Sequence, residues 1–411
     1  MVEKFNPTSD FPKLDRTNEA LGPGGGEDLD VEEVGQEVEL DQPKTESNVE
    51  LVQDGSAVIN PEEPQIQATF NSNLAEFLDE SYLQALANDL NEKVDNDKAT
   101  REDWEQSYTK GLDLLGFKYE ERTRPFRGAA SVNHPMLAQA VTQFQAMAYV
   151  ELLPADGPVR TQVVGANSPQ IQSAAERVKD YMNYEITHVM EDYNPEMDTL
   201  LFQLPLAGSA FKKVYYDEVL GRATSKFIPA EDVIVPYGCS DLDDCERITQ
   251  VLKMTMNDLR KKQVSGFYLD IPSVGYDGTN GSDLQEKKDQ IDGESPGNYA
   301  MDDMAELYEL HVDLDLEGFE DINPVDGEPT GIKLPYIVTI DKSSNAVLSI
   351  YRNYNANDPL RKKNDYFVHY KFLPGLGFYG FGLIHMIGGL TRTATSALRQ
   401  LLDAGTLSNL P

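Results

Sequence analysis

The sequence predicts an α+β protein, because helix-type and strand-type hydrophobic patterns occupy separate parts of the chain. Between Asn73 and Leu206 apolar residues recur mostly at helical spacing. From Ala210 to Phe372 they fall mainly into short runs and alternations that are typical of β-strands. A glycine-rich apolar run and a last two-faced helix pattern follow, so we expect a mixed domain that leads into a long C-terminal helix.

Residues 1–73 are predicted to form a disordered acidic N-terminal arm. Residues 1–80 contain 20 Asp and Glu against 4 Lys and Arg, about half of the net charge of −35. Low hydrophobicity with high net charge cannot offset the entropy that ordering costs. Two interpretations stay open: a solvated tail, or an arm that orders only against a neighbouring subunit.

Helices are predicted where apolar residues line one face and start or stop signals flank them. Ser168 and Pro169 are a typical N-cap and first helical residue, and Gly116 and Gly208 are typical glycines past a helix end. The predicted helices are Asn73–Leu90, Arg101–Leu115, Pro135–Leu153, Ser168–Val189, Asn194–Leu206 and a short one capped by Thr255 and running to Val264. The helix that begins at Ser168 is expected to point its apolar residues inward: Ile171, Ala174, Val178, Tyr181, Met182, Ile186 and Val189.

Strands are predicted from β-branched and aromatic runs bounded by turn residues. They are Val159–Val164, Ala210–Tyr216, Ala223–Ile228, Val233–Tyr237, Ile248–Met254, Leu307–Leu316, a hairpin of Tyr336–Ile340 and Val347–Arg352, and Tyr366–Phe372. Residues 269–305 are polar and turn-rich, so they are predicted to be an exposed loop between strands.

The C-terminal stretch, residues 373–411, is predicted to be a glycine-rich hinge followed by a two-faced helix near 389–404. The run Phe372–Leu390 is long enough for a membrane span, but its glycines favour a buried hinge. The helix places Arg392, Ser396 and Arg399 opposite an apolar face. The predicted hinge glycines are Gly375, Gly377, Gly380, Gly382, Gly388 and Gly389, and the apolar face is Leu390, Ala394, Ala397, Leu398, Leu401 and Leu402.

No catalytic, cofactor-binding or metal-binding residues are predicted. Cys239 and Cys245 lack partner histidines and are expected to be reduced thiols. The glycine spacing at Gly375, Gly377 and Gly380 matches the dinucleotide fingerprint, but no strand–turn–helix unit surrounds it. We therefore expect a protein that is not an enzyme; a hydrolase that uses carboxylates is the weaker alternative.

One basic cluster stands out in this acidic chain: Arg122, Arg124 and Arg127 in a predicted loop. In an acidic protein such arginines are more often paired with carboxylates than bound to phosphate. We therefore expect these arginines to form ion pairs, with carboxylates of a neighbouring subunit as candidate partners. The strong negative charge also predicts weak contacts with any DNA.

Long segments of the chain resemble the portal proteins of tailed bacteriophages. The likeness runs from about residue 73 to the end and is densest in NLAEFLDESYL (73–83), WEQSYTKGLDLLGFKYEERTRPFRGAASVNHPMLAQAVTQFQA (104–146), ELLPADGPVRTQVVG (151–165), MDTLLFQLPLAGSAFKKVYYD (197–217), IPAEDVIVPYG (228–238), RITQVLKMTMNDLRKKQVSGFY (247–268) and FYGFGLIHMIGGLTRTATSALRQLLDAGTLSNLP (378–411). The likeness is to the family as a whole, extends over long segments of the sequence and involves no catalytic motif.

The resemblance implies a structural subunit of a ring of twelve at the portal vertex of the virion capsid, made in the host cytoplasm. DNA is packaged and ejected through this ring. The implied partners are other copies of the chain, capsid protein, the terminase motor, tail or adaptor proteins and the double-stranded DNA that passes through. No contact with a membrane is implied. Residues 74–268 and 306–372 would form the peripheral wing and 373–411 the joint to the channel-lining stem.

In this interpretation the apolar side of the last helix packs within the ring. Arg392, Ser396 and Arg399 then face a neighbour or the channel. Family members continue into a clip, a second stem helix and a crown that this sequence does not contain, so we expect it to represent about half of such a subunit. The main alternative is an acidic, non-enzymatic scaffold or adaptor that binds other virion proteins.

Overall fold

The chain divides into two units, Met1–Ile66 and Gln67–Pro411. The computed structural model describes residues 49–51, 57–59, 68–117, 122–165, 168–217, 220–273, 283–293, 304–322 and 328–408. In the first unit the described residues form two short antiparallel strands, β1 (Val49–Leu51) and β2 (Ala57–Ile59). Residues 68–73 of the predicted disordered arm belong instead to the second unit, where the buried Asn73 side chain donates to the Leu348 oxygen at 3.2 Å and accepts from the Ile350 amide at 2.9 Å. The remainder of the predicted arm lies outside the described residues.

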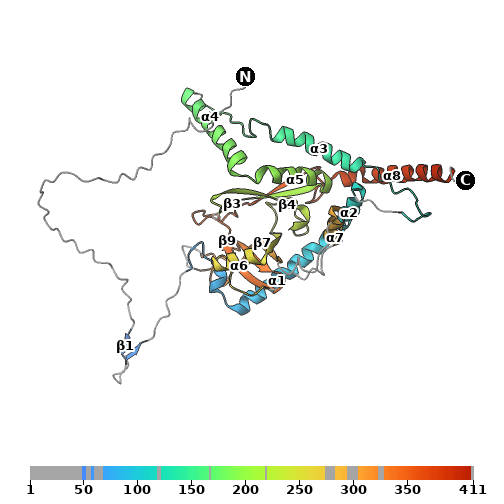
Figure 1. Ribbon diagram of the computed structural model, residues 1–411. Coiled ribbons are helices and arrows are strands. Elements are labelled where there is room, and N and C mark those ends of the chain that lie inside the picture. The colour runs from blue at the N-terminus through green and yellow to red at the C-terminus, as the bar shows by residue number, and fades with distance from the viewer. Residues whose placement is uncertain are drawn as a thin grey trace, which may run out of the picture. The chain divides into compact units, whose positions relative to one another are not determined.

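The second unit has an α+β fold, as predicted, with two antiparallel sheets (Figure 1). The larger sheet has the order β5-β6-β7-β8-β9 and the smaller one the order β10-β3-β4. Their strands are β3 (Ser209–Asp217), β4 (Arg222–Pro229), β5 (Val233–Ile234), β6 (Arg247–Thr255), β7 (Met304–Leu314), β8 (Leu334–Asp341), β9 (Ala346–Arg352) and β10 (Phe367–Lys371).

Most helices of the second unit cover these sheets or pack against one another. The helices are α1 (Glu80–Thr100), α2 (Glu102–Leu112), α3 (Met136–Leu152), α4 (Pro169–Tyr184), α5 (Tyr193–Ala207), α6 (Met256–Val264), α7 (Asp283–Asp292) and α8 (Leu383–Ser408). Single turns are added by the 3₁₀ helices Leu74–Phe77, Asp113–Leu115 and Ala230–Asp232, and a π-helical turn, Glu185–Val189, extends α4.

Several helix boundaries follow from the local signals in the sequence. The Ser168 hydroxyl accepts a hydrogen bond from the Ile171 amide at 3.3 Å, and the Thr255 hydroxyl accepts one from the Asp258 amide at 3.1 Å. Gly116 (φ 73°) and Gly208 (φ 89°) end their helices in the left-handed region that glycine adopts without strain. These caps are confirmed as predicted.

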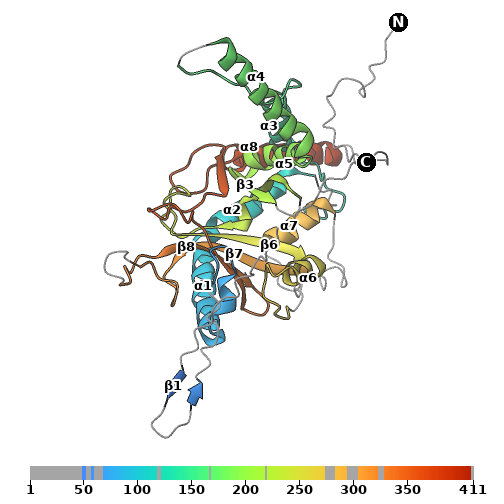
Figure 2. The same ribbon diagram turned by 90° about the vertical axis from the view of Figure 1, so that its left-hand side faces the viewer.

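The core of the larger sheet lies under α1. Leu83, Ala87 and Leu90 of α1 are buried against strand residues such as Leu310 and Val338, and Figure 2 shows the helix running beside β7 and β8. The smaller sheet is covered by α5, whose Leu200 and Leu201 pack with Ala210 of β3. Hydrophobic burial on this scale is the main term that holds each layer together.

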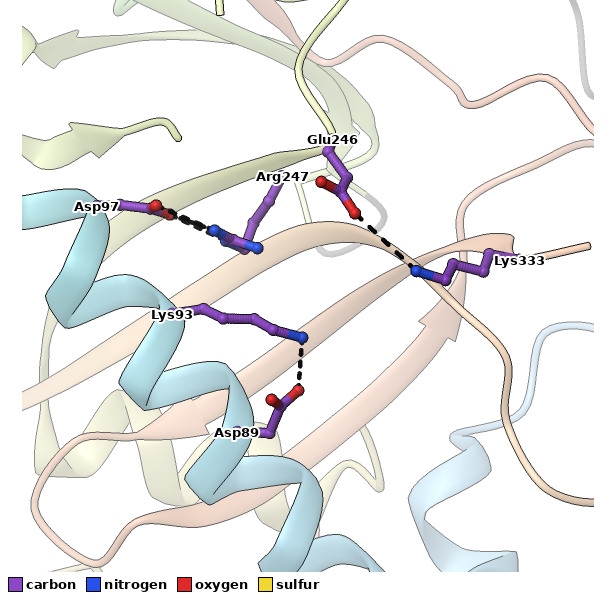
Figure 3. Close-up of polar contacts among 6 residues, drawn as sticks. All are labelled: Asp89, Lys93, Asp97, Glu246, Arg247 and Lys333. Carbon is purple, nitrogen blue, oxygen red and sulfur yellow. Dashed lines mark hydrogen bonds and ion pairs between the residues drawn. The ribbon is translucent and has the colours of Figure 1, made fainter. Parts of the chain in front are cut away.

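A buried ion pair joins α1 to β6. The Arg247 guanidinium donates to both carboxylate oxygens of Asp97, at 2.7 and 3.0 Å through Nη2 and at 2.9 Å through Nε (Figure 3). Burial raises the pKa of the Asp97 carboxyl even though Arg247 acts in the opposite direction. The pairs Lys93–Asp89 and Lys333–Glu246 in the same view are exposed and contribute far less.

Several predicted elements differ in the structure. The predicted helix Asn73–Leu90 is a 3₁₀ turn followed by α1, which runs on to Thr100, and the predicted strand Val233–Tyr237 is shortened to β5. Residues Val159–Val164 form no strand; instead the Asn183 side chain both donates to and accepts from the Val159 backbone, so an amide group takes the place of a partner strand. Within the predicted exposed loop 269–305, residues 283–292 form α7, because Leu284 inserts into the core beside Tyr108 of α2. The two apolar residues of α7, Leu284 and Ile291, were too weak a signal to reveal this helix.

Candidate interaction surface

The base of α8 is fixed by three glycines that meet backbone to backbone. A Cβ added at Gly208 would lie 2.4 Å from the Gly380 oxygen, and one added at Gly380 would lie 2.5 Å from the Gly208 oxygen. One added at Gly382 would lie 2.3 Å from the Leu206 oxygen. Only glycine permits this approach. The Phe372 amide also donates to the Gly208 oxygen at 3.0 Å, so the end of β10 and the start of α8 are both held against the end of α5.

A polar chain reinforces this contact. The Gly380 amide donates to the Ser209 hydroxyl at 2.8 Å, and that hydroxyl lies 3.1 Å from His369 Nε2. The His369 ring stacks on Phe211 with centroids 4.3 Å apart. Burial lowers the pKa of His369 to about 4, with Lys371 acting in the same direction, so the imidazole is neutral near pH 7.

The six glycines predicted to form a hinge therefore have different surroundings. Gly380 and Gly382 lie in the tight junction, and at Gly375 an added Cβ would lie 3.0 Å from the Tyr379 oxygen. Gly388 and Gly389 lie inside α8, which begins at Leu383, earlier than predicted. Around Gly377 and Gly389 there is open space. The close packing predicted here holds for Gly380 and Gly382 and not for the whole set.

The polar side of α8 binds the segment 130–134 of its own chain. Thr395 Oγ1 accepts from the His134 amide at 3.0 Å, and Asp403 Oδ1 accepts from the Ala130 amide at 2.6 Å. Arg399 donates through Nε to the Val132 oxygen at 2.8 Å and through Nη2 to the Asn133 side chain. Arg399 therefore contacts its own chain, whereas the prediction was that it faces a neighbour or the channel. Arg392 and Ser396 are exposed.

Sequence patterns gave no sign of the 130–134 contact, because, apart from the Asn133 side chain, its partners in that loop are backbone groups. A backbone amide or carbonyl carries no residue-specific signature, and only the fold places Ala130 and Val132 beside α8. The predicted helix pattern assigned Arg399 correctly to the polar face but could not tell which molecule that face meets.

The apolar side of α8 is exposed along most of its length. Met386, Leu390, Ala397 and Leu401 recur at intervals of four, seven and four residues, which places them on one face. Leu390 is 63% exposed and Leu401 71%. The loop before the helix adds Leu373, Leu376 and Phe381, all exposed. We call these seven residues the α8 stripe; Met386 belongs to it although the predicted face began only at Leu390.

A second exposed apolar surface lies on α3 and α4. The first half of α3 is buried, but Met147 and Val150 in its second half are 61% and 71% exposed. No residue of α4 is buried, which overturns the prediction that its apolar face points inward. In both ribbon views α4 extends away from the sheets (Figures 1 and 2). We call Met147, Val150, Ile171, Val178, Tyr181 and Met182 the α3–α4 face.

The arginine cluster lies in the loop before α3. Arg122 donates to the Ala130 oxygen at 3.1 Å, which braces the segment that binds α8. Arg124 and Arg127 are exposed, and neither forms an ion pair with another described residue. The predicted pairing between subunits stays a prediction.

Other chemistry can be stated only for the described part of the chain. There, no group of three or more His, Cys, Asp and Glu is arranged to hold a metal ion, and Cys239 and Cys245 are free thiols. Among the described helices, none is long and apolar enough to cross a membrane. The most distinctive features are thus two exposed apolar surfaces, which on soluble proteins often mark interaction sites.

No protein-family model matches the chain, and no curated protein matches it.

Proposed function

We propose that this chain is a structural subunit of a portal ring, the channel at one capsid vertex of a tailed bacteriophage. The observation that carries the proposal is the pair of exposed apolar surfaces, the α8 stripe and the α3–α4 face. They lie on different helices and differ in composition. Contacts between two unlike surfaces of identical subunits repeat in one rotational direction, which generates a closed ring when the rotation closes.

The sequence resemblance supplies the kind of ring. It runs from about residue 73 to the end of the chain, and its densest segments include most of the α8 stripe but not the residues of the α3–α4 face. In this interpretation the sheets and α1–α7 form the wing, and α8 leads towards the channel. The ring would be a dodecamer in the virion. Copies of this chain, capsid protein, a terminase motor and tail proteins would be its partners.

The net charge supports weak contacts with the DNA that passes through such a ring. The chain carries 70 acidic against 35 basic residues, so it repels a polyanion except at local basic sites. Sliding DNA is favoured by a wall that binds phosphate weakly. The same composition would also suit the alternative, an acidic scaffold or adaptor, so charge alone does not choose between them.

Sedimentation velocity and negative-stain imaging of the full chain test the proposal. We expect ring-shaped particles with rotational symmetry. Placing two charges in the α8 stripe, Leu390→Glu with Leu401→Glu, should convert them to monomers, because an interface cannot bury unpaired carboxylates. Val264→Glu, an equally exposed apolar residue at the end of α6, is the matched control and should leave the rings intact.

Two results would contradict the proposal. A full chain that stays monomeric at every concentration tested would favour the adaptor, which needs no self-association. Rings that persist in the Leu390→Glu/Leu401→Glu variant would remove the α8 stripe from the subunit interface.

A further inference from the structure

Three lysines of this acidic protein converge beside the junction of the two sheets. Lys213 of β3 and Lys226 of β4 are directly opposite each other in the antiparallel register, so their side chains leave the same face of the smaller sheet. Like charges in directly opposed positions destabilise a strand pair. Lys262 of α6 is the third member, and we call the three residues the lysine cluster.

Packing brings Lys262 to the place where Lys213 ends. The Lys262 ammonium lies 5.2 Å from the centre of the Tyr268 ring, and Tyr268 packs against Leu307 of β7. Glu309 lies two residues after Leu307 in β7, so its side chain is on the same face of the strand, and it forms an ion pair with Lys213. Figure 1 shows α6 against the larger sheet, on the side that the smaller sheet also faces.

The electrostatic surroundings of Lys262 agree with this placement. Burial is the main cause that lowers the pKa of the Lys262 ammonium; Glu309 acts in the opposite direction, and Lys213 and Lys226 lower it further. Asp217 also favours the charged form. Lys213 and Lys226, which are opposite each other in the strand register, thus both act against the charge on Lys262.

The nearby carboxylates are already engaged. Glu309 binds Lys213 and lies 2.8 Å from His311 Nε2, and Asp217 accepts the Leu220 amide at 3.1 Å. Among the described residues, neither Lys226 nor Lys262 has an ion-pair partner. A partly buried ammonium beside two like charges costs free energy unless an anion compensates it.

We propose that Lys213, Lys226 and Lys262 form a binding site for a single oxyanion, either a phosphate or the carboxylate of an acidic side chain. Lys213 and Lys226 leave the same face of the sheet opposite each other, and Lys262 packs near the partner of Lys213, so this compact group suits one anion. Duplex DNA presents a row of phosphates and would need basic residues along a stripe. Lysine is a compact charge with three donors and binds either oxyanion well. The site lies apart from the α8 stripe and does not depend on the proposed ring.

Thermal unfolding of the full chain, with and without inorganic phosphate at constant ionic strength, tests the site. Near-saturating phosphate should raise the Tm of the wild-type chain by about 2–4 °C. Lys262→Gln should raise the Tm without phosphate, because it removes the repulsion, and should abolish the response to phosphate. Lys226→Gln, at an exposed position that tolerates the change, should do the same.

The adjacent residue provides the control. Lys261 is exposed and pairs with Asp258 on α6, so Lys261→Gln should leave the response to phosphate intact. A glutamate-rich peptide, added in place of phosphate, identifies the source of the anion. A response to either probe that Lys262→Gln removes supports the site. No response to either probe, or an equal response in wild type, Lys262→Gln and Lys261→Gln, overturns it.

Discussion

Gly380 lies so close to Gly208 that a Cβ atom on Gly380 would stand 2.5 Å from the Gly208 carbonyl oxygen. Backbone cannot move aside as a flexible side chain can, so Gly380→Ala should force α8 away from α5. We expect a loss of about 2–4 kcal/mol in the free energy of unfolding, typical of a steric insertion into packed structure. Urea denaturation measures this loss, and ring formation should fall with it.

Gly389→Ala is the matched control for this change. Gly389 lies within α8 with open space around it, so alanine should leave stability unchanged or raise it by about 0.5–1 kcal/mol through helix propensity. Equal losses in the two variants would mean that the contact between Gly380 and Gly208 does not hold the base of α8.

The ion pair between Lys213 and Glu309 should contribute to stability in a pH-dependent way. Burial disfavours the charged carboxylate, but Lys213 and His311 together hold the pKa of Glu309 well below its usual range. Glu309→Gln leaves the Lys213 ammonium without its partner and should lower the free energy of unfolding by about 3 kcal/mol near neutral pH. Asp89→Asn, which breaks the exposed pair with Lys93, should cost less than about 1 kcal/mol.

The sign of the pH effect follows from the lowered pKa. Such a carboxylate stabilises the fold fully above the ordinary glutamate pKa of 4.5, and its contribution is lost as the pH falls below that value. The difference between wild type and Glu309→Gln in urea denaturation should therefore shrink in acid. A constant difference down to low pH would show that Glu309 acts by packing and not by charge.

Lys212 is buried without a hydrogen-bond partner among the described residues, and its ammonium lies 4.2 Å from the centre of the Tyr193 ring. Burial lowers its pKa from 10.5 to about 8, partly opposed by Glu196. Near pH 7 the fold thus holds a desolvated charge, and Lys212→Met should raise the free energy of unfolding by about 1–3 kcal/mol.

The same residue gives a second, independent measurement. Between the folded pKa of about 8 and the unfolded value of 10.5, the unfolded chain binds the proton that the folded chain has lost, so Lys212 makes stability rise with pH. The gain from Lys212→Met should shrink as the pH is raised through this window. Lys93→Met, which changes an exposed lysine of α1, should show no such trend. A parallel trend would show that the effect comes from the net charge of the protein and not from the burial of Lys212.

Much of the fold could be predicted because its signals are local. Ser168 and Thr255 cap the helices that they precede, and Gly116 and Gly208 end theirs, since each acts within one turn of backbone. Alternation predicted β7, and two strand-type runs joined by a short turn predicted the β8–β9 hairpin. What failed depends on distant partners: α7 exists because Leu284 reaches Tyr108, some 175 residues earlier, and nothing near Leu284 announces that contact.

The candidate surfaces show the same limit more sharply. Periodicity identified the apolar residues of α4 and α8 correctly, because it depends only on 3.6 residues per turn. It assigned α4 to the core, because in most helices an apolar face is buried within its own chain. Which side of α8 its own chain would cover depended on the backbone of residues 130–134, which carries no side-chain signal.

The α3–α4 face should matter for assembly and not for the stability of the single chain. Val178 and Tyr181 are 51% and 65% exposed, so Val178→Glu with Tyr181→Glu removes little buried area and should change the free energy of unfolding of the monomer by less than about 1 kcal/mol. The same change should prevent ring formation in sedimentation velocity.

Leu201→Ala, which changes a buried residue of α5, is the opposite control. It should lower the free energy of unfolding by about 2–5 kcal/mol and weaken rings only through unfolding. If the α4 variant proved as unstable as Leu201→Ala, then α4 would be packed against its own chain in solution, and the ring would need another second surface.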